Sequence, residues 1–197
     1  MSEALLRSLV WLDFRLAVLF TVLLPLVLLI WAFVQKNEAI QRLLIIYWRV
    51  SSLLAVTVYL LIGGALVSFL SGPLARVLIP ISLWFWVDLN EEISEQRRSP
   101  LKLAFTAWRW AVSVYCVLGV LGTLPFLQCA FSRATFSTPF CQVWAEPPLL
   151  YKQFFHAGST PQFLGFLGIL GLGVYVLCLL YFVIFRLGKQ GRSALEQ

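Results

Sequence analysis

Charged residues are scarce in this chain. Asp, Glu, Lys and Arg make up 12% of its 197 residues, whereas an average soluble domain has roughly 25%. Hydrophobic residues make up 60%. This composition argues against an ordinary soluble protein and favours one polytopic membrane domain over residues 1–197. The net charge of +6 comes largely from short connections between apolar runs, so it indicates membrane orientation, and nucleic acid is not a predicted partner.

Histidine is almost absent, since His156 is the only one. A single histidine excludes a haem held by two histidines of one chain and limits a histidine-based metal site to one loop residue. Common catalytic motifs are missing as well: there is no GxxxxGK[ST] loop, no GxSxG elbow and no HExxH pair. We therefore predict no enzyme, no metal site and no cofactor. The sequence leaves open whether the helices bind lipid or carotenoid.

Five stretches are apolar enough to lie in a bilayer, which predicts an all-α fold with about five transmembrane helices. They are residues 16–34, 43–70, 74–87, 103–127 and 163–185. The third is only about fourteen residues long and contains Pro80, so it is either a short span or a re-entrant segment. Pro25 in the first stretch predicts a distortion whose freed carbonyl group must be hydrogen-bonded by neighbouring helices.

An internal repeat favours a third segment that crosses. Residues 31–38 and 84–91 share the pattern W-x-aromatic-V-x-x-N-E. Each copy is followed by a Trp-Arg pair and a Tyr-x-x-x-Gly motif, which are Trp48-Arg49 with Tyr59 to Gly63, and Trp108-Arg109 with Tyr115 to Gly119. Two copies of the same orientation predict two parallel helix hairpins followed by a fifth helix. The alternative is that aromatic and basic residues recur at interfaces by chance.

Two arginines, Arg49 and Arg109, lie inside apolar stretches, where an ionised side chain is costly. The hairpin arrangement places them near polar residues at the ends of the first and third stretches, which are Asn37, Glu38, Asp88, Asn90 and Glu91. We expect the arginines to pair with these acids and to serve packing and topology. The alternative is that the cluster lines an entrance for a solute or ion.

Lys and Arg are more numerous on the side of the C-terminus, whether the third segment crosses or is re-entrant, and this bias sets the expected orientation. It predicts a cytoplasmic tail at residues 186–197 and a non-cytoplasmic loop at residues 128–161. Cys129 and Cys141 lie in this loop, about a dozen residues apart. In an oxidising compartment two such cysteines predict a disulfide.

Several runs of the sequence are similar to one known family. They are Ile45 to Leu53 (IIYWRVSSL), Leu78 to Glu92 (LIPISLWFWVDLNEE), Glu146 to Lys152 (EPPLLYK) and Arg186 to Arg192 (RLGKQGR). These runs resemble a cyanobacterial family of uncharacterised integral membrane proteins, some of which carry a permease label. The resemblance extends over nearly the whole chain. It implies a photosynthetic context, with the thylakoid or plasma membrane as location, and it assigns no role to any residue.

Two functions of different classes fit these observations. The first is a non-catalytic auxiliary or assembly factor, or a small subunit, of a photosynthetic or other membrane complex. The second is an oligomeric permease or channel for a small solute or ion. The expected partners are membrane lipids together with either a membrane-protein complex or further copies of this chain.

Overall fold

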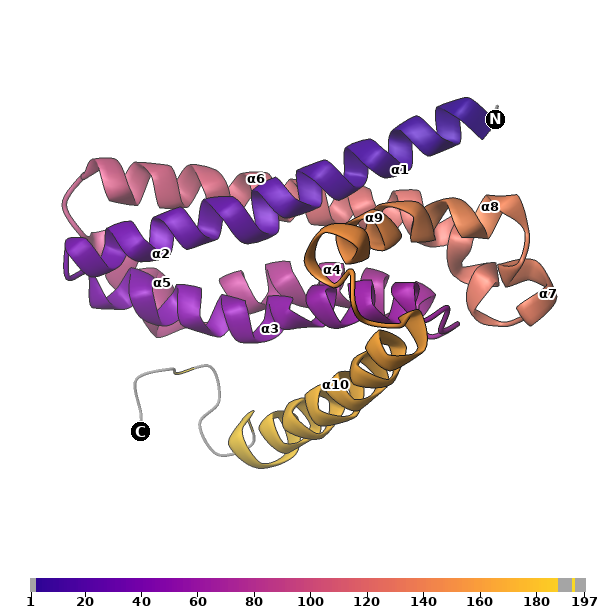
Figure 1. The fold of residues 1–197 in the computed structure, drawn as a ribbon. Helices are drawn as coiled ribbons and strands as arrows, with labels where there is room; N and C mark the ends of the chain where they lie inside the picture. Colours follow the sequence, from indigo (N-terminus) through magenta and orange to yellow (C-terminus); the bar gives the residue numbers. More distant parts are fainter. Residues whose placement is uncertain (1–2, 188–192, 194–197) are drawn as a thin grey trace.

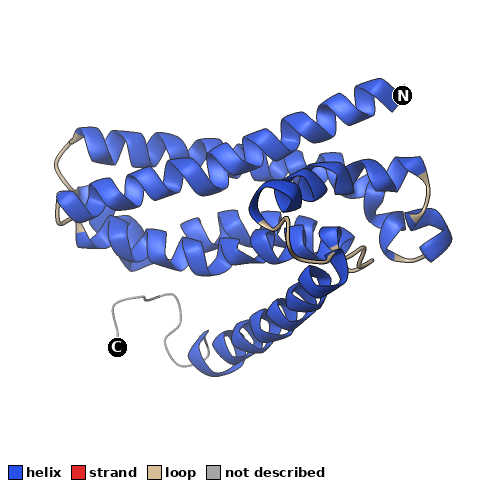
Figure 2. Cartoon of the chain, viewed as in Figure 1, coloured by secondary structure: helices blue, strands red, loops and turns tan. Residues whose placement is uncertain are grey.

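Helices account for all regular structure in the computed structural model, which describes residues 3–187 and residue 193 (Figure 2). This confirms the predicted all-α class. One continuous N-terminal helix is formed by α1 (Glu3–Ala17), the π-helix η1 (Val18–Leu23) and α2 (Leu24–Val34). The other long helices are α3 (Glu38–Ile62), α4 (Ser68–Trp84), α6 (Pro100–Thr123) and α10 (Pro161–Tyr181). The short elements are α5 (Val87–Glu95), η2 (Leu124–Ala130), α7 (Arg133–Phe136), α8 (Pro139–Gln142), η3 (Val143–Ala145), α9 (Glu146–Phe155) and η4 (Phe182–Leu187).

The number of helices that could cross a membrane also agrees with the prediction. Among the described residues, four helices have the length and apolar composition of a span: the N-terminal helix, α3, α6 with η2, and α10 with the start of η4. A fifth is obtained when α4 and α5, which are bent by 56° at their junction, are counted as one. The third predicted segment is therefore a bent helix pair.

The connections between long helices gather at two ends of the bundle (Figure 1). We call one the turn end, where residues 35–37 join α2 to α3, and the other the cap end, which carries the cap, residues 124–160. Asn37 and Gln96 exchange side-chain hydrogen bonds of 2.7 and 3.2 Å, so α5 finishes at the turn end. The Ser68 amide donates to the Ala65 carbonyl just after α3, so α4 starts at the cap end. Thus α4 runs from the cap end to the turn end, as the paired hairpins require.

Pro25 distorts the N-terminal helix, and two other helices compensate for it. Proline has no N–H, so the Thr21 carbonyl four residues earlier loses its normal donor, and the chain forms a π-helix at Val18–Leu23. The Tyr47 hydroxyl of α3 donates to the Thr21 carbonyl at 2.8 Å. The Trp108 indole of α6 donates to the Phe20 carbonyl, also at 2.8 Å. Both carbonyl groups thus accept hydrogen bonds from neighbouring helices, which is necessary in hydrocarbon because no water is present as an alternative partner.

Two apolar cores lie at opposite ends of the bundle. The larger core joins the N-terminal helix, α3, α4, α5 and α6 toward the turn end, and its fully buried side chains include Tyr47, Leu83, Leu89 and Phe105. The smaller core holds the cap against α1 and α4 through Val10, Phe69, Phe126, Phe136 and Val143. Hydrophobic burial therefore fixes both ends of the helices.

α10 is joined to the bundle by a close contact between glycines. A Cβ placed on Gly165 would lie 2.7 Å from the Gly63 Cα, and one on Gly168 would lie 2.9 Å from the Leu60 backbone nitrogen. The absence of side chains lets the backbones of α3 and α10 approach closely. The Tyr175 hydroxyl adds a 3.2 Å hydrogen bond to the Val50 carbonyl. α10 thus packs along one line of α3 and diverges from the other helices (Figure 1).

We predict that Gly165→Ala destabilises the attachment of α10 by about 1–3 kcal/mol, because the new methyl group must push the two backbones apart. Gly173→Ala is the matched control, since a Cβ there meets nothing within 4 Å. Thermal unfolding in mild detergent, together with protease sensitivity of residues 156–160, measures the effect. Equal stability of the two variants would contradict the proposed packing.

Candidate functional site

A buried ion pair joins two helices that are far apart in the sequence. The Arg76 guanidinium of α4 donates through Nη2 to the Asp13 carboxylate of α1. The side chains are 9% and 21% exposed, so both charges are largely removed from solvent. Charge-assisted hydrogen bonds of this kind are among the strongest that side chains make. The pair therefore fixes the position of α4 relative to the N-terminal helix.

α6 completes this charged site with a tyrosine and a glycine. The Tyr115 hydroxyl donates to Asp13 Oδ1 at 3.0 Å and receives a longer contact, 3.4 Å, from Arg76 Nη2. Arg76 Nη1 donates to the Gly119 carbonyl at 3.1 Å. A Cβ on Gly119 would lie 2.8 Å from Arg76 Nη1, so a larger residue here would displace the guanidinium from its present position. Three helices thus meet at Arg76, and both residues of the second Tyr-x-x-x-Gly motif take part.

Arg109 occupies a second buried site nearer the turn end. It donates through Nη1 to the Asn90 side-chain oxygen, and its guanidinium carbon lies 3.9 Å from the ring centroid of Trp84. The Trp84 indole N–H in turn donates to Ser113 Oγ at 3.0 Å. A cation over the face of a tryptophan is favourable, particularly when it is shielded from water. Arg109 therefore links α4, α5 and α6.

The other members of the predicted polar cluster are dispersed. Arg49 is exposed on α3, and Glu38 forms an exposed 3.2 Å ion pair with Arg42 on the same helix. Asn37 caps α3 and bonds to Gln96. Asp88 is half-buried and accepts a hydrogen bond from Ser193, and the exposed Glu91 uses its carbonyl to accept one from Ser94. Within the predicted cluster, the structure brings Arg109 to the amide of Asn90, whereas the expected pairing was with an acid.

Asp13 and Arg76 lie outside the predicted polar cluster, because the apolar stretches that the sequence predicts begin at residues 16 and 74. The third apolar stretch is expected to begin at residue 74, which puts Arg76 near its start. In the structure Pro73 lies inside α4, so Arg76 occupies the middle of the helix. Likewise, α1 continues on the N-terminal side of the apolar stretch that starts at Leu16, and it carries Asp13. Arg76 lies eight residues after Ser68, where α4 begins, within an otherwise apolar segment. An arginine in such a segment indicates a buried charge that needs a partner.

A disulfide joins Cys129 and Cys141 in the cap, with the two Cα atoms 6.0 Å apart. Both residues are buried in the smaller core. The bond links η2 to α8, just before η3 and α9. It therefore holds the segment that places α9 over the bundle. Cys116 and Cys178 are free thiols.

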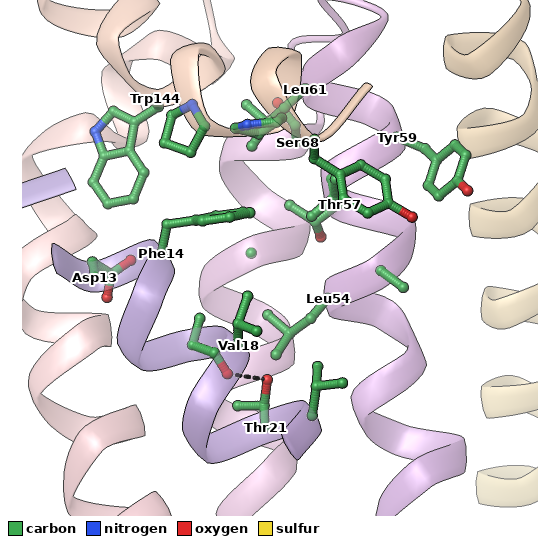
Figure 3. A pocket seen from close by; sticks show the side chains of 18 of the residues that line it. Asp13, Phe14, Val18, Thr21, Leu54, Thr57, Tyr59, Leu61, Ser68 and Trp144 are labelled. Atoms are coloured by element: carbon green, nitrogen blue, oxygen red, sulfur yellow. Dashed lines mark hydrogen bonds between the residues drawn. The ribbon is translucent and has the colours of Figure 1, made fainter. Parts of the chain in front are cut away.

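A cavity of about 750 Å³ opens beside the Asp13–Arg76 pair (Figure 3). Its walls come from the N-terminal helix, α3 and α4, and α9 covers it at the cap end. Most lining side chains are apolar or aromatic, and Phe14, Val18 and Leu54 face the same space in Figure 3. No group of His, Cys, Asp and Glu among the described residues could hold a metal ion.

Apolar helices of membrane-spanning length, with the buried charges placed between them, define an integral membrane protein with several transmembrane helices. Residues 7–195 match the DUF3177 family, which is described as a protein of unknown function. The match spans nearly the whole chain, so this protein belongs to that family. A search of curated proteins and a search of solved structures each found no match. The family of uncharacterised membrane proteins expected from the sequence is thereby supported, while its cyanobacterial origin stays a prediction.

We predict that Asp13→Leu destabilises the fold by about 3 kcal/mol or more, because it leaves the Arg76 guanidinium buried without its counter-charge. Arg76→Leu added to Asp13→Leu should recover much of that loss, since no uncompensated charge remains. Arg15→Leu, at an exposed position of the same helix, is the control. Chemical denaturation of the purified variants in detergent gives the coupling energy. A double variant no more stable than Asp13→Leu would argue against the pair.

The two arginines of the repeat should respond differently to substitution. Arg109→Ala removes the contacts with Asn90 and Trp84 and should lower stability by about 2 kcal/mol. Arg49→Ala removes an exposed side chain and should change stability by less than about 0.5 kcal/mol. Membrane abundance and thermal unfolding measure both. Similar losses in the two variants would show that Arg49 has a structural role that its exposed position does not suggest.

Proposed function

We propose that this protein is a non-catalytic auxiliary subunit or assembly factor of a membrane-protein complex. The observation that supports this most is the attachment of α10. In its most apolar stretch, 6% of the residues are buried, compared with 22–33% in the other three long helices. A helix held along a single line leaves most of its surface free to pack against other transmembrane helices.

The side chains on the free surface of α10 suit such packing. Phe166, Ile169, Leu170 and Leu177 are each more than half exposed. Packing in membranes depends on van der Waals contact between complementary helix surfaces, because hydrophobicity does not distinguish lipid from protein. The partner in this proposal is therefore a transmembrane helix of a larger complex that covers the outer side of α10.

The charges inside the bundle also favour a structural role over a transport pathway. Arg76 is engaged by an acid, a tyrosine and a backbone carbonyl, and Arg109 is engaged by an amide and an aromatic ring. These contacts join neighbouring helices. A transported ion would have to displace them and would leave polar groups unpaired in hydrocarbon.

The distribution of charge suggests an orientation. Lys36, Arg42, Arg97 and Arg98 are exposed at the turn end, so the rule that positive charges face the cytoplasm places this end there. The cap then lies in the opposite, oxidising compartment, where its disulfide is stable. The location proposed is a thylakoid or plasma membrane, with the C-terminus in the cytoplasm.

An oligomeric permease or channel is the second candidate. The observation in its favour is that the Asp13–Arg76 pair borders the large cavity, so a charged site lies beside an internal space. In that role, substitution of the pair would abolish flux at normal protein abundance.

Purification in a gentle detergent, with mass spectrometry of co-eluting proteins, tests the auxiliary role. We expect the wild type to carry a membrane complex at stoichiometric yield. Ile169→Ala, Leu170→Ala and Leu177→Ala combined should reduce that yield at least fivefold, because they remove contact surface from the outer side of α10.

The matched control combines Val117→Ala, Leu118→Ala and Leu121→Ala, which reduce an exposed apolar surface of α6 by similar chemistry. It should retain the complex. A wild type that elutes as a homo-oligomer without other proteins would contradict the auxiliary role and favour transport. If both triple variants lose the complex to the same extent, the outer side of α10 is not the specific contact surface.

A further inference from the structure

The cavity is a built feature of the helix arrangement. The N-terminal helix and α3 are held together near the turn end by the hydrogen bond from Tyr47 to the Thr21 carbonyl, and they separate toward the cap end, where α9 lies over the space between them (Figure 1). Small residues line the wall where larger ones would fill it: Ala17, Ser51, Ala55 and Gly72. Gly72 has room for a side chain, since its nearest contact would be Thr57 Cγ2 at 3.5 Å. The small size of these side chains therefore keeps the cavity open.

The cavity is long enough for a chain-like ligand. Its lining along α3 extends from Trp48 to Leu61, a rise of about 20 Å for thirteen residues of α-helix. Its volume of about 750 Å³ lies within the usual range of roughly 300–1,000 Å³ for small-molecule sites. An apolar space of this kind does not hold water well, because water needs several polar partners. Within a membrane, apolar chains are the molecules available to fill it.

Polar groups are found toward the cap end of the cavity. The Tyr59 hydroxyl and the His156 ring nitrogen share a 2.9 Å hydrogen bond there, beside α9. Trp11 donates to Glu146 at 3.3 Å at the same end. Toward the turn end the lining includes Val18, Val22 and Leu54. The hydroxyl groups of Thr21, Ser51 and Ser52, which also line this end, donate to carbonyl groups of their own helices. The site thus has the polarity of a lipid, with its polar end near the membrane surface and its apolar end inside.

A tryptophan at the cap end has an unused donor. The indole nitrogen of Trp144, which lines the cavity, is buried and has no hydrogen-bond partner among residues 3–187 and 193. Leaving a buried N–H unpaired costs about 1–3 kcal/mol. In Figure 3 the nitrogen lies on the side of the ring away from Phe14 and Leu54, so the ring must turn over to present this N–H to an acceptor in the cavity. An ester carbonyl of a lipid is an acceptor at the right depth, just below the polar end.

We propose that the cavity binds one acyl chain of an ester-linked membrane lipid, drawn from the leaflet at the cap end. The chain lies along α3 toward Trp48 and Val22, the ester carbonyl is near Trp144, and the head group lies beside Tyr59 and His156. α9 closes the site from the surface, and the lipid enters sideways between the N-terminal helix and α3. This inference is independent of the protein partner proposed above.

The test uses phosphatidylcholine vesicles that contain the full-length protein and a phosphatidylcholine with a photoactivatable diazirine in the middle of one acyl chain. After illumination, mass spectrometry of peptides locates the label. We expect labelling on residues of α3 that line the cavity, such as Ser51 and Leu54. Ala55→Phe, which narrows the cavity from an exposed position of α3, should reduce that labelling at least fivefold.

Ala107→Phe is the matched control, because Ala107 is exposed on α6 and does not line the cavity. It should leave labelling unchanged. Val18→Trp, on the opposite wall, also fills part of the cavity and serves as the second blocked variant if Ala55→Phe does not fold. Labelling that persists in both blocked variants, or that falls only on outward residues such as Leu118 and Leu121, overturns the proposal.

Lipids extracted from gently purified protein distinguish the sources of an apolar chain. One ester-linked lipid per chain, lost in Ala55→Phe and kept in Ala107→Phe, supports the proposal. A stoichiometric isoprenoid, such as a carotenoid or a quinone, overturns the assignment to an acyl chain. Detergent alone in the purified protein, together with no cavity labelling in vesicles, overturns the site itself.

Discussion

The ion pair between Asp13 and Arg76 is the constraint on which the arrangement of the bundle depends. Arg76 lies in the middle of α4, so its charge must be compensated inside the helix bundle. Asp13 provides the opposite charge from α1, and α6 provides Tyr115 and the Gly119 carbonyl. Three helices from distant parts of the sequence therefore have one relative position in which the charge is satisfied. The cavity lies beside this pair, between the N-terminal helix and α3, while α4 packs closely against α3.

The same physical rule explains the other polar contacts between helices. The carbonyl groups of Phe20 and Thr21, disturbed by Pro25, receive donors from Trp108 and Tyr47. Arg109 is placed between Trp84 and Asn90. In hydrocarbon an unsatisfied polar group is costly, so each of these groups inside the bundle requires a hydrogen-bonding or charged partner on a neighbouring helix. α10 lacks such internal charges and packs through glycines instead, which explains why it is the least enclosed of the long helices.

Sequence patterns predicted the helical class, the number of spans and the need for donors near Pro25, because hydropathy and the missing proline N–H are local properties. They also marked Tyr115 and Gly119, although the partner of these residues was not foreseen. Arg49 and Arg109 look equivalent in the repeat, yet one is exposed and the other is buried. That difference depends on which side of each helix meets its neighbours. The cavity could not be predicted either, because it arises from the angle between two helices whose residues are individually ordinary.

Accessibility of single cysteines in intact membranes tests most directly whether α4 and α5 together cross from the cap end to the turn end. In a background with Cys116 and Cys178 replaced by alanine, single cysteines at Gln35, Arg97 and Ser137 are labelled with a membrane-impermeant maleimide. All three positions are exposed. We expect Gln35→Cys and Arg97→Cys to react from one side and Ser137→Cys from the other. Reaction of Gln35→Cys and Arg97→Cys from opposite sides would show that α4 and α5 return to the side from which α4 started, and would contradict a crossing by this helix pair.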